Sequence, residues 1–197
     1  MTTLWIAVGV LGALLVAFCA GSFLLLAMGR VHLDLGWGRS VHELGPIAID
    51  VAAPRELVFE VLSAPYVGRA SGGAEVEVLA RREGIAVAAH FTKVHFYTAR
   101  TVEVVELDAP TRLGFRHLTG PVPHAVEQFE LDGVGERTEL RYDGEIGIDF
   151  FVLGRVAARY WVRPQWERTV RQHLEDVRRR AEQRADRQRA RDSAQID

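Results

Sequence analysis

An uncharged apolar run near the start of the chain limits what this sequence can fold into. Residues 4–28 contain no charged side chain, and the few that are not hydrophobic are small: Gly9, Gly12, Gly21 and Ser22. A bilayer core about 30 Å thick needs roughly 20 apolar residues in a helix, so this run is long enough to cross a membrane. The sequence therefore predicts a transmembrane helix over 4–28 and a single-pass protein of the cell membrane.

Two other uses of such a run are disfavoured. A cleaved signal peptide has a basic start and a shorter apolar core. Here the first three residues carry no Lys or Arg, and the apolar run resumes after Ser22. Lipid attachment at Cys19 is disfavoured because Phe18 stands where a small residue is needed. With this single cysteine, a disulfide framework is excluded.

The residues beside the run suggest its orientation. No basic side chain precedes it, whereas Arg30 and Arg39 follow with only Asp34 between them, so the positive-inside rule predicts a cytoplasmic soluble domain. Small residues recur every four positions within the run, a spacing that permits a weak homodimer through the transmembrane helix. Chance explains this spacing better in a segment so rich in Gly and Ala. These small residues are Gly9, Ala13, Ala17 and Gly21.

Beyond the run, we expect a linker over 29–43 and one folded domain over 44–180. The linker is rich in Gly, His and charge, and Trp37 suits the headgroup layer of a membrane. Alternation over 46–51 predicts a strand. Pro54 suits the first turn of a helix, which is predicted to end before Pro65.

Six further strands are predicted, joined by short links with turn residues, which favours antiparallel neighbours. In the last strand Leu140, Tyr142 and Ile146 alternate with charged residues, so one face of the sheet is expected to be wet and the other covered. The expected strands are 75–80, 85–97, 101–107, 112–118, 125–131 and 138–148.

From Phe150 the apolar period becomes helical, and Pro164 is expected to kink or divide this long helix. The apolar face fades after Val177, and 181–197 is predicted to be an Arg-rich helical extension or tail that frays. Residues 150–197 hold twelve arginines against seven acidic residues. They could lie against anionic lipid, but a solvated helix with pairs such as Glu182 with Arg178 is favoured. Nucleic acid is not expected as a partner, because the tail lacks interleaved aromatics and the rest of the chain is acidic.

The order of strand, helix, antiparallel strands and long C-terminal helix resembles the helix-grip fold of the START/Bet v1-like (SRPBCC) superfamily, specifically its polyketide cyclase/dehydrase-like bacterial members. Three blocks carry the resemblance: 49–65, which includes an Ala-Pro helix start; 104–116, with Pro-Thr-Arg-Leu; and 129–140, with a glycine hairpin. Many relatives have a tryptophan soon after the first helix, at the mouth of the cavity, whereas 64–73 has none.

This resemblance implies an α+β domain in which a curved antiparallel sheet wraps around the C-terminal helix, in addition to the N-terminal transmembrane helix. It also implies a cavity for a hydrophobic or amphipathic small molecule. Some members of the superfamily catalyse cyclisation or dehydration there and others only carry ligands, so the fold does not decide the function.

The sequence offers little support for a metal or a cofactor. His90 and His95 are five residues apart on one predicted strand and should point to opposite faces, and His117 and His124 have no acid cluster nearby. Phosphate-cradling loops, dinucleotide fingerprints and nucleophile motifs are absent from the sequence. We therefore predict no metal site and no cofactor.

Polar residues that share a phase with apolar ones are the candidates for a site. His117 is in phase with Phe115, and Glu127 with Phe129; a buried Glu would have a raised pKa, which suits acid/base chemistry on a ketone. Glu127 and His117 are therefore the candidate catalytic pair. The competing explanation for the polar residues is a structural hydrogen bond. For the helix residues Tyr160 and Trp161 it is packing in the core. The full predicted ligand-binding set is His95, Tyr97, Phe115, His117, Glu127, Phe129, Tyr142, Tyr160 and Trp161.

The leading hypothesis is membrane-anchored binding or transport of a hydrophobic small molecule or lipid, without catalysis. The alternatives are an enzyme of the cyclase/dehydratase type acting on a polyketide-like or other hydrophobic substrate, and an interaction module whose cavity is filled by its own side chains.

Overall fold

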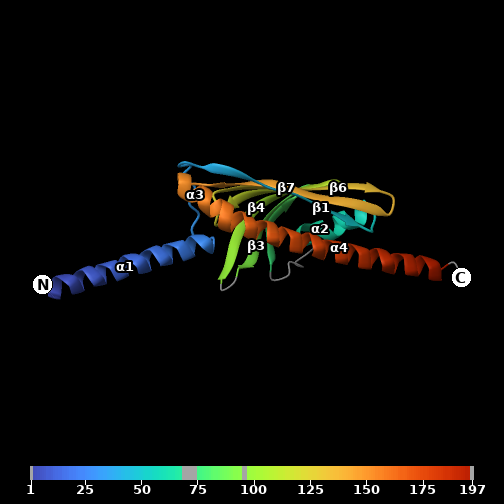
Figure 1. Ribbon diagram of the computed structural model, residues 1–197. Helices are drawn as coiled ribbons and strands as arrows, with labels where there is room; N and C mark the ends of the chain where they lie inside the picture. The colour runs from blue at the N-terminus through green and yellow to red at the C-terminus, as the bar shows by residue number, and fades with distance from the viewer. Residues whose placement is uncertain (1, 68–74, 95–96, 196–197) are drawn as a thin grey trace.

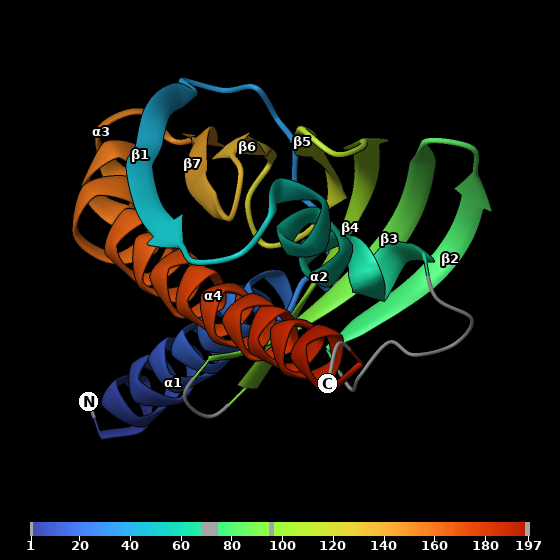
Figure 2. The same ribbon diagram turned by 90° about the vertical axis from the view of Figure 1, so that its right-hand side faces the viewer.

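Seven antiparallel strands form one curved sheet around the C-terminal helix (Figures 1 and 2). The computed structural model describes residues 2–67, 75–94 and 97–195. The strand order is β1-β7-β6-β5-β4-β3-β2, and α2 lies inside the curve with α4 across its open side. The elements are α1 (Thr2–Ala27), β1 (Ser40–Val51), α2 (Arg55–Val67), β2 (Val76–Arg82), β3 (Ile85–Val94), β4 (Tyr97–Asp108), β5 (Arg112–Thr119), β6 (His124–Val134), β7 (Arg137–Ile148), α3 (Phe151–Ala157), a π-helical turn η1 (Ala158–Val162) and α4 (Arg163–Ala194).

The predicted wet and covered faces are confirmed in β7. Leu140, Tyr142 and Ile146 are fully buried, while Arg137, Glu139 and Arg141 are exposed. The buried side chains point toward α2 and α4, so the inner face of the sheet forms the core. This arrangement is the α+β helix-grip architecture that the element order predicted.

β1 begins at Ser40, six residues earlier than the alternation predicted. It pairs with β7 from Ser40 opposite Ile148, but the register shifts between Leu44 and Ile47. Gly45 has φ +80 at this bulge, where an added Cβ would meet the carbonyl oxygen of Tyr142 at 2.8 Å. The bulge breaks the alternation, which explains why the first half of the strand was missed.

The strand predicted over 85–97 is wrong in its second half. β3 ends at Val94, and Tyr97 begins β4, where it pairs back with Val94. Tyr97 is therefore not on one strand with Phe91, although a single strand was predicted over 85–97. His95 lies outside the described residues.

α2 continues past Pro65 to Val67, so the prediction that it ends before Pro65 is wrong. Pro65 lies in the last turn of this helix, where a missing backbone donor disturbs few hydrogen bonds. Tyr66, which follows it, is buried and packs inside the sheet.

The long C-terminal helix is divided, as Pro164 predicted. The π-helical turn η1 separates α3 from α4, and Pro164 lies in the first turn of α4. Such turns widen a helix locally and shift the phase of its side chains. The apolar face of α4 then packs against the core through Val170, Leu174 and Val177.

The first part of the Arg-rich extension packs against the domain, where a fraying helix was expected. Ala181 and Ala185 are buried, and the helix continues to Ala194. Glu182 does not pair with Arg178, as had been expected, but accepts a hydrogen bond from the backbone N–H of Ala52 at 3.1 Å. Two surface ion pairs, Arg184 with Glu60 and Arg189 with Glu136, also tie this part of α4 to the domain.

α1 projects from the domain, and its residues 5–27 form a helix long and apolar enough to cross a membrane, with a mean hydropathy of 2.5. A signal sequence shares these properties. Added Cβ atoms at Gly9, Gly12 or Gly21 would meet nothing within 4 Å. Pairing of two chains through this face stays a prediction.

The segment between α1 and β1 is fastened to the domain. Arg100 donates a backbone hydrogen bond to the carbonyl of Met28 at 3.0 Å. Asp149, which is 2% exposed, accepts from the backbone N–H groups of Leu35 and Gly36 at 3.0 Å and from Arg39 Nε at 2.8 Å. These contacts fix where α1 ends relative to the sheet.

Candidate functional site

A carboxylate bridged to the helix lies at the centre of the inner face. Glu127 of β6 accepts a hydrogen bond from the Tyr142 hydroxyl of β7 at 2.6 Å and from Trp166 Nε1 of α4 at 2.8 Å. Both donors reach the same oxygen, Oε1, which leaves Oε2 without a hydrogen bond from the described part of the chain. The sheet and the long helix are thus joined at one acidic group.

The pKa of Glu127 is raised, mainly because burial disfavours its charged form and secondarily because of the nearby Glu103 carboxylate. The hydrogen bonds from Tyr142 and Trp166 and the charge on His117 act in the opposite direction without cancelling the effect. A carboxyl group in this state retains its proton at higher pH than usual, so it is able to donate that proton to a bound ligand.

A second carboxylate, Glu103 of β4, lies between two histidines. Its Oε1 is 2.8 Å from His117 Nε2 and its Oε2 is 3.2 Å from His90 Nδ1. The His117 N–H is not aligned with the carboxylate, so the contact is an ion pair rather than a linear hydrogen bond. Glu103 and the His117 side chain are almost fully buried.

These two groups stabilise each other's charge. Burial acts to raise the pKa of Glu103, but His117, His90 and Thr101 lower it overall. Burial acts to lower the pKa of His117, but Glu103 and then Glu127 raise it overall. These shifts favour the ionised form of Glu103 and the protonated form of His117, beside a carboxyl group, Glu127, whose shift favours the neutral form. Opposite shifts in two neighbouring carboxyl groups are a common feature of acid/base sites.

Two polar residues beside this cluster, His173 and Glu127, lie where α4 faces the sheet. His173 on α4 has an exposed side chain, yet its pKa is lowered by burial, and its ring lies 6.0 Å from that of the buried Phe129. Glu127 likewise keeps part of its surface accessible although protein surrounds it. A ligand bound between α4 and the sheet would contact these two residues.

Aromatic rings line the rest of the inner face. Phe115 makes edge contacts with Tyr66 and Phe129, both at 5.7 Å, and Phe129 packs on Tyr142 at 5.1 Å. The Tyr66 hydroxyl is 3.4 Å from His90 Nε2. The polar groups are therefore set among rings that suit a hydrophobic ligand.

The structure brings most of the predicted site residues together. Phe115 and Glu127 are cross-strand partners, so His117, two residues from Phe115, shares their face. His117 and Glu127 also both contact Trp166. The predicted residues that converge on the inner face are Phe115, His117, Glu127, Phe129 and Tyr142.

Other predicted site residues lie elsewhere. Tyr160 is 73% exposed, and Trp161 stacks on Phe23 of α1 at 5.4 Å between ring centroids. The π-helical turn that contains them places them away from the cluster, contrary to the expectation from helical phase. Tyr97 is half-buried at the start of β4, and burial raises its pKa. His95, as noted above, is outside the part of the chain that the structure describes.

Sequence reasoning missed five members of the cluster, which the structure adds to the site. Glu103 alternates in phase with Val105 and Leu107, but Val102 and Val104 make the opposite phase equally apolar. The alternation therefore does not indicate which face of β4 is the inner one. In β3 the side chain that reaches the cluster is His90, not Phe91. The missed residues are Tyr66, His90, Glu103, Trp166 and His173.

Metal ligation does not offer a competing candidate among the described residues, and a hollow of about 480 Å³ has Glu127 in its lining, together with Glu43, Gln128 and Asp143. Within the described ranges, no three His, Cys, Asp or Glu side chains are grouped to hold a metal ion. A hollow of about 510 Å³ lies among charged residues of the outer strand ends, including Asp108, Arg112 and Glu139, and includes none of the predicted site residues.

Comparison with known proteins identifies the architecture. TTHA0849 from Thermus thermophilus has a similar structure, with a TM-score of 0.59 and 18% identity over 71% of this chain and 97% of that one. The chain has the helix-grip fold. The di-domain ARO/CYC StfQ from the steffimycin biosynthetic pathway is also similar, with a TM-score of 0.53 and 14% identity over 75% of this chain and 52% of that one. No protein-family model and no curated protein sequence matches the chain. At these identities the likeness establishes the fold.

Proposed function

We propose that this chain is a single-pass membrane protein whose helix-grip domain binds a hydrophobic small molecule or lipid between the sheet and α4. The ligand would lie against the aromatic rings of the inner face, with a polar group directed toward Glu127. The observation that carries the proposal is Glu127 itself: a buried carboxyl with a raised pKa and an Oε2 that has no hydrogen-bond partner among the described residues.

The membrane anchor supports this role. α1 has the length and hydropathy of a membrane-spanning helix, and the contacts of Met28, Leu35 and Gly36 hold the domain next to its end. A ligand dissolved in the bilayer would therefore have a short path to the inner face of the sheet. We place the domain on the cytoplasmic side, because the basic residues Arg30 and Arg39 follow the span.

Photo-crosslinking of the full chain in liposomes tests the binding. The probe is a fatty acid that carries a diazirine on its acyl chain, and labelled peptides are mapped by mass spectrometry. We expect labels on inner-face peptides from β5, β6 and α4, and competition by excess unlabelled fatty acid. Labels on α1 report that the probe has entered the bilayer. Labelling confined to α1 and exposed segments would contradict the proposal.

A matched pair of variants sharpens this test. His173→Phe places a larger apolar ring between α4 and the sheet, near Phe129, and should reduce the inner-face labels several-fold. Gln172→Phe adds the same ring at the neighbouring exposed position and should leave them unchanged. Equal labelling in both variants would place the binding elsewhere.

An enzyme of the cyclase/dehydratase type is the second candidate, favoured by the opposite pKa shifts of Glu103 and Glu127. In such a reaction a base removes a proton next to a ketone while an acid protonates its oxygen, giving an enol. Glu127 would supply the acid in its neutral form. Incubation of the full chain with a long-chain ketone in D₂O should then exchange the protons next to the carbonyl, and Glu127→Gln should slow this exchange. No exchange above the protein-free rate would contradict an enzyme of this kind.

A further inference from the structure

One end of the domain carries apolar side chains that the fold does not cover. They lie on α3 and η1 and are about half to three-quarters exposed, with Leu153 at 77% the most exposed. Scattered exposed apolar residues are normal on a soluble protein, but a continuous patch marks an interaction site. This surface, called the α3 surface below, consists of Phe151, Val152, Leu153, Val156, Tyr160 and Trp161.

The backbone is shaped to present this surface. Phe150 and Phe151 have φ values of 76 and 50, a left-handed conformation that costs bulky residues of order 1–2 kcal/mol each. Glycines make room nearby: an added Cβ on Gly38 would lie 2.4 Å from the Phe151 ring, and one on Gly154 would lie 1.9 Å from the carbonyl oxygen of Asp149. Strain of this kind persists where the surrounding contacts fix a particular geometry.

The α3 surface is continuous with the end of α1. The Trp161 ring stacks on Phe23, which belongs to the apolar segment that is long enough to cross a membrane. Trp37, just after α1, makes an edge contact with Phe151 at 5.8 Å. In Figure 1, α3 lies at the same end of the domain as the end of α1, while the C-terminus of α4 lies at the opposite end. If Phe23 is in the bilayer, Trp161 lies at its surface.

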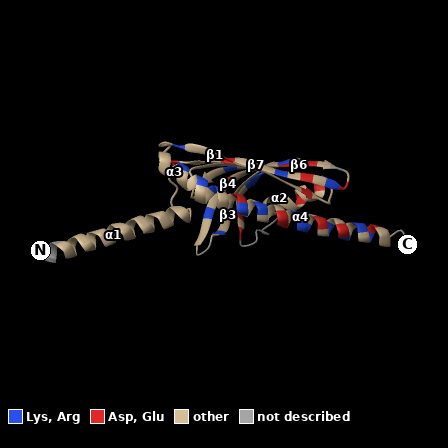
Figure 3. Ribbon diagram, viewed as in Figure 1, with Lys and Arg blue, Asp and Glu red and all other residues tan. Residues whose placement is uncertain are grey.

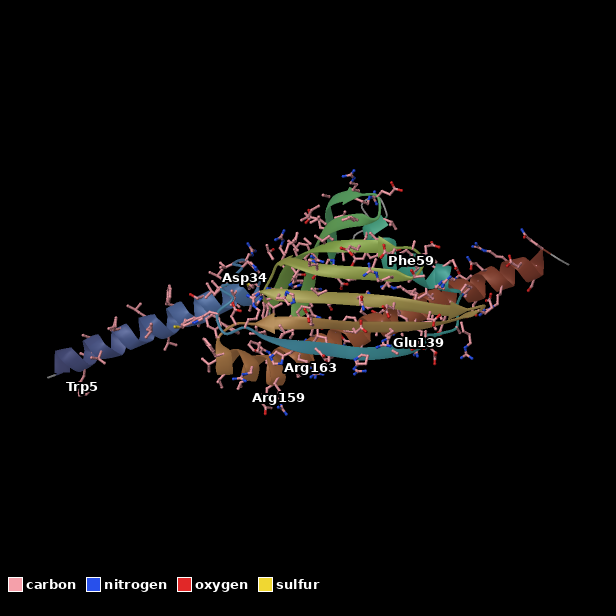
Figure 4. The ribbon with its side chains drawn as sticks, turned by 90° about the horizontal axis from the view of Figure 1, so that it is seen from above. Trp5, Asp34, Phe59, Glu139, Arg159 and Arg163 are labelled. Carbon is pink, nitrogen blue, oxygen red and sulfur yellow. The ribbon has the colours of Figure 1, made fainter. Side chains whose placement is uncertain are left out.

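The charge on this segment suits an anionic membrane. Between Phe150 and Trp166 the sequence contains Arg155, Arg159 and Arg163 and no acidic residue. All three arginines are exposed, and Arg163 also pairs with Glu167 at 2.9 Å. Figure 3 colours basic residues along α3 and the start of α4, and Figure 4 shows the side chains of Arg159 and Arg163 at the edge of the molecule. Each basic residue near an anionic leaflet contributes about 1 kcal/mol to membrane binding. The Arg-rich end of α4, by contrast, lies far from α1.

We propose that the α3 surface inserts into the interfacial layer of an anionic bilayer beside α1, so that the membrane holds the domain at two points. This inference rests on the proposed membrane anchor. The aromatic rings lie at the headgroup level and the aliphatic side chains lie below them, as in interfacial helices. Contact at two points fixes the tilt of the domain and keeps the first turns of α4, which carry Trp166, close to the lipid.

Site-directed spin labelling of the full chain in liposomes tests this arrangement. The liposomes contain phosphatidylcholine alone or phosphatidylcholine with phosphatidylglycerol. Labels are placed on native Cys19, and, in a Cys19→Ser background, on Leu153→Cys or on Ser193→Cys near the far end of α4. Accessibility to oxygen, which concentrates in lipid, is compared with accessibility to a water-soluble nickel chelate. Val156→Cys serves as a second position on the α3 surface.

We expect the oxygen-to-nickel ratio at position 153 to be several-fold higher than at position 193, and to rise further when phosphatidylglycerol is present. The double variant Arg155→Gln/Arg159→Gln should remove that further rise. The matched double variant Arg179→Gln/Arg187→Gln, at exposed positions of α4 away from α3, should not.

Three results would overturn the inference, and they differ from one another. Nickel access at 153 equal to that at 193, with Cys19 protected, would show an anchored protein whose α3 surface stays in water. Nickel access at Cys19 as well would show that the proposed anchor itself is wrong. Protection at 153 from both reagents, with dipolar coupling between labels that disappears on dilution with unlabelled chain, would show a second copy on this surface instead of lipid.

Discussion

Trp166 Nε1 donates a hydrogen bond to Glu127 across the gap between α4 and β6, at 2.8 Å. This bond joins the helix to the sheet at the proposed site. The indole therefore holds the Glu127 carboxylate in place, in addition to packing its ring against His117. It also holds the Glu127 oxygen that Tyr142 contacts, which leaves the other oxygen free to meet a ligand.

Trp166→Phe keeps an aromatic ring but removes the donor. We expect the free energy of unfolding to fall by about 1–2 kcal/mol, as for other hydrogen bonds to buried acceptors. The measurement is urea unfolding of the detergent-solubilised full chain, followed by circular dichroism. Trp161→Phe is the matched control, because its exposed ring contributes a stacking contact with Phe23 that a phenyl ring is still able to make. Equal effects of the two substitutions would contradict a role for the bond.

Glu103→Gln leaves His117 and His90 without their shared carboxylate. Removing one member of a buried ion pair is costly, so we expect a loss of about 3 kcal/mol in the same measurement. Glu106→Gln, on the same strand but with a half-exposed side chain, should change stability by no more than about 0.5 kcal/mol. A small effect at Glu103 would mean that the pair contributes little to folding.

The same pair should give stability a defined pH window. The lowered pKa of Glu103 means that its contribution is present above its unfolded value of about 4.3 and lost as the pH falls through the folded value. The raised pKa of His117 means that its contribution is present below about 6.5 and lost as the pH rises through the folded value. Wild type should therefore exceed Glu103→Gln by the largest margin between these two values.

Glu127→Gln should change the pH dependence in a different way. Because the pKa of Glu127 is raised, the folded state binds its proton more tightly than the unfolded state. Its contribution is fully present below about 4.3 and falls as the pH rises toward the folded pKa. The stability difference between wild type and Glu127→Gln should therefore decline across that range, whereas Glu139→Gln on the outer face should run parallel to wild type. A constant difference for Glu127→Gln would contradict the raised pKa.

The contrast between Tyr142 and Glu103 shows how far the sequence predicts this site. β7 alternates regularly, so Tyr142 and its neighbours could be assigned to the inner face from their phase alone. β4 is apolar in both phases around Val104 and Val105, and its pairing with β5 shifts register between Val102 and Glu103. A local pattern does not determine which face Glu103 occupies there. The element order, by contrast, depended on many turns and strands together, and the fold was predicted correctly.

Contacts between distant segments could not be predicted, because local sequence patterns do not indicate which remote residues will meet. Asp149 directly follows β7, and nothing in the sequence indicates that Leu35, Gly36 and Arg39, more than 100 residues earlier, will bind it. The sequence also gives no indication of the π-helical turn. Because of this turn, Tyr160 and Trp161 lie on the outside and not on the expected inner face.

Asp149→Asn should loosen the segment after α1. Asparagine keeps one acceptor but loses the charge that binds Arg39, so we expect a local loss of about 2 kcal/mol. Hydrogen exchange at the Leu35 and Gly36 amides, both of which donate to Asp149, should then be at least about tenfold faster, since 1.4 kcal/mol corresponds to tenfold. Asp34→Asn is the control, because Asp34 is half-exposed and binds the same Arg39 without touching either amide. Unchanged exchange in Asp149→Asn would mean that other contacts hold this segment.

Gly154→Ala should disrupt α3 without unfolding the sheet. The added Cβ would lie 1.9 Å from the carbonyl oxygen of Asp149, which is backbone and has little freedom to move, so α3 must shift away. Overpacking of this kind costs about 1–3 kcal/mol. The amides of Phe150 and Phe151 bond to Trp37 and Gly38, and their exchange should accelerate while that of β7 amides stays slow. Gly12→Ala, with nothing within 4 Å of its added Cβ, should leave all of these rates unchanged. Faster exchange throughout β7 would instead show that α3 and the sheet unfold as one unit, because a local shift of α3 has no means of exposing the β7 hydrogen bonds.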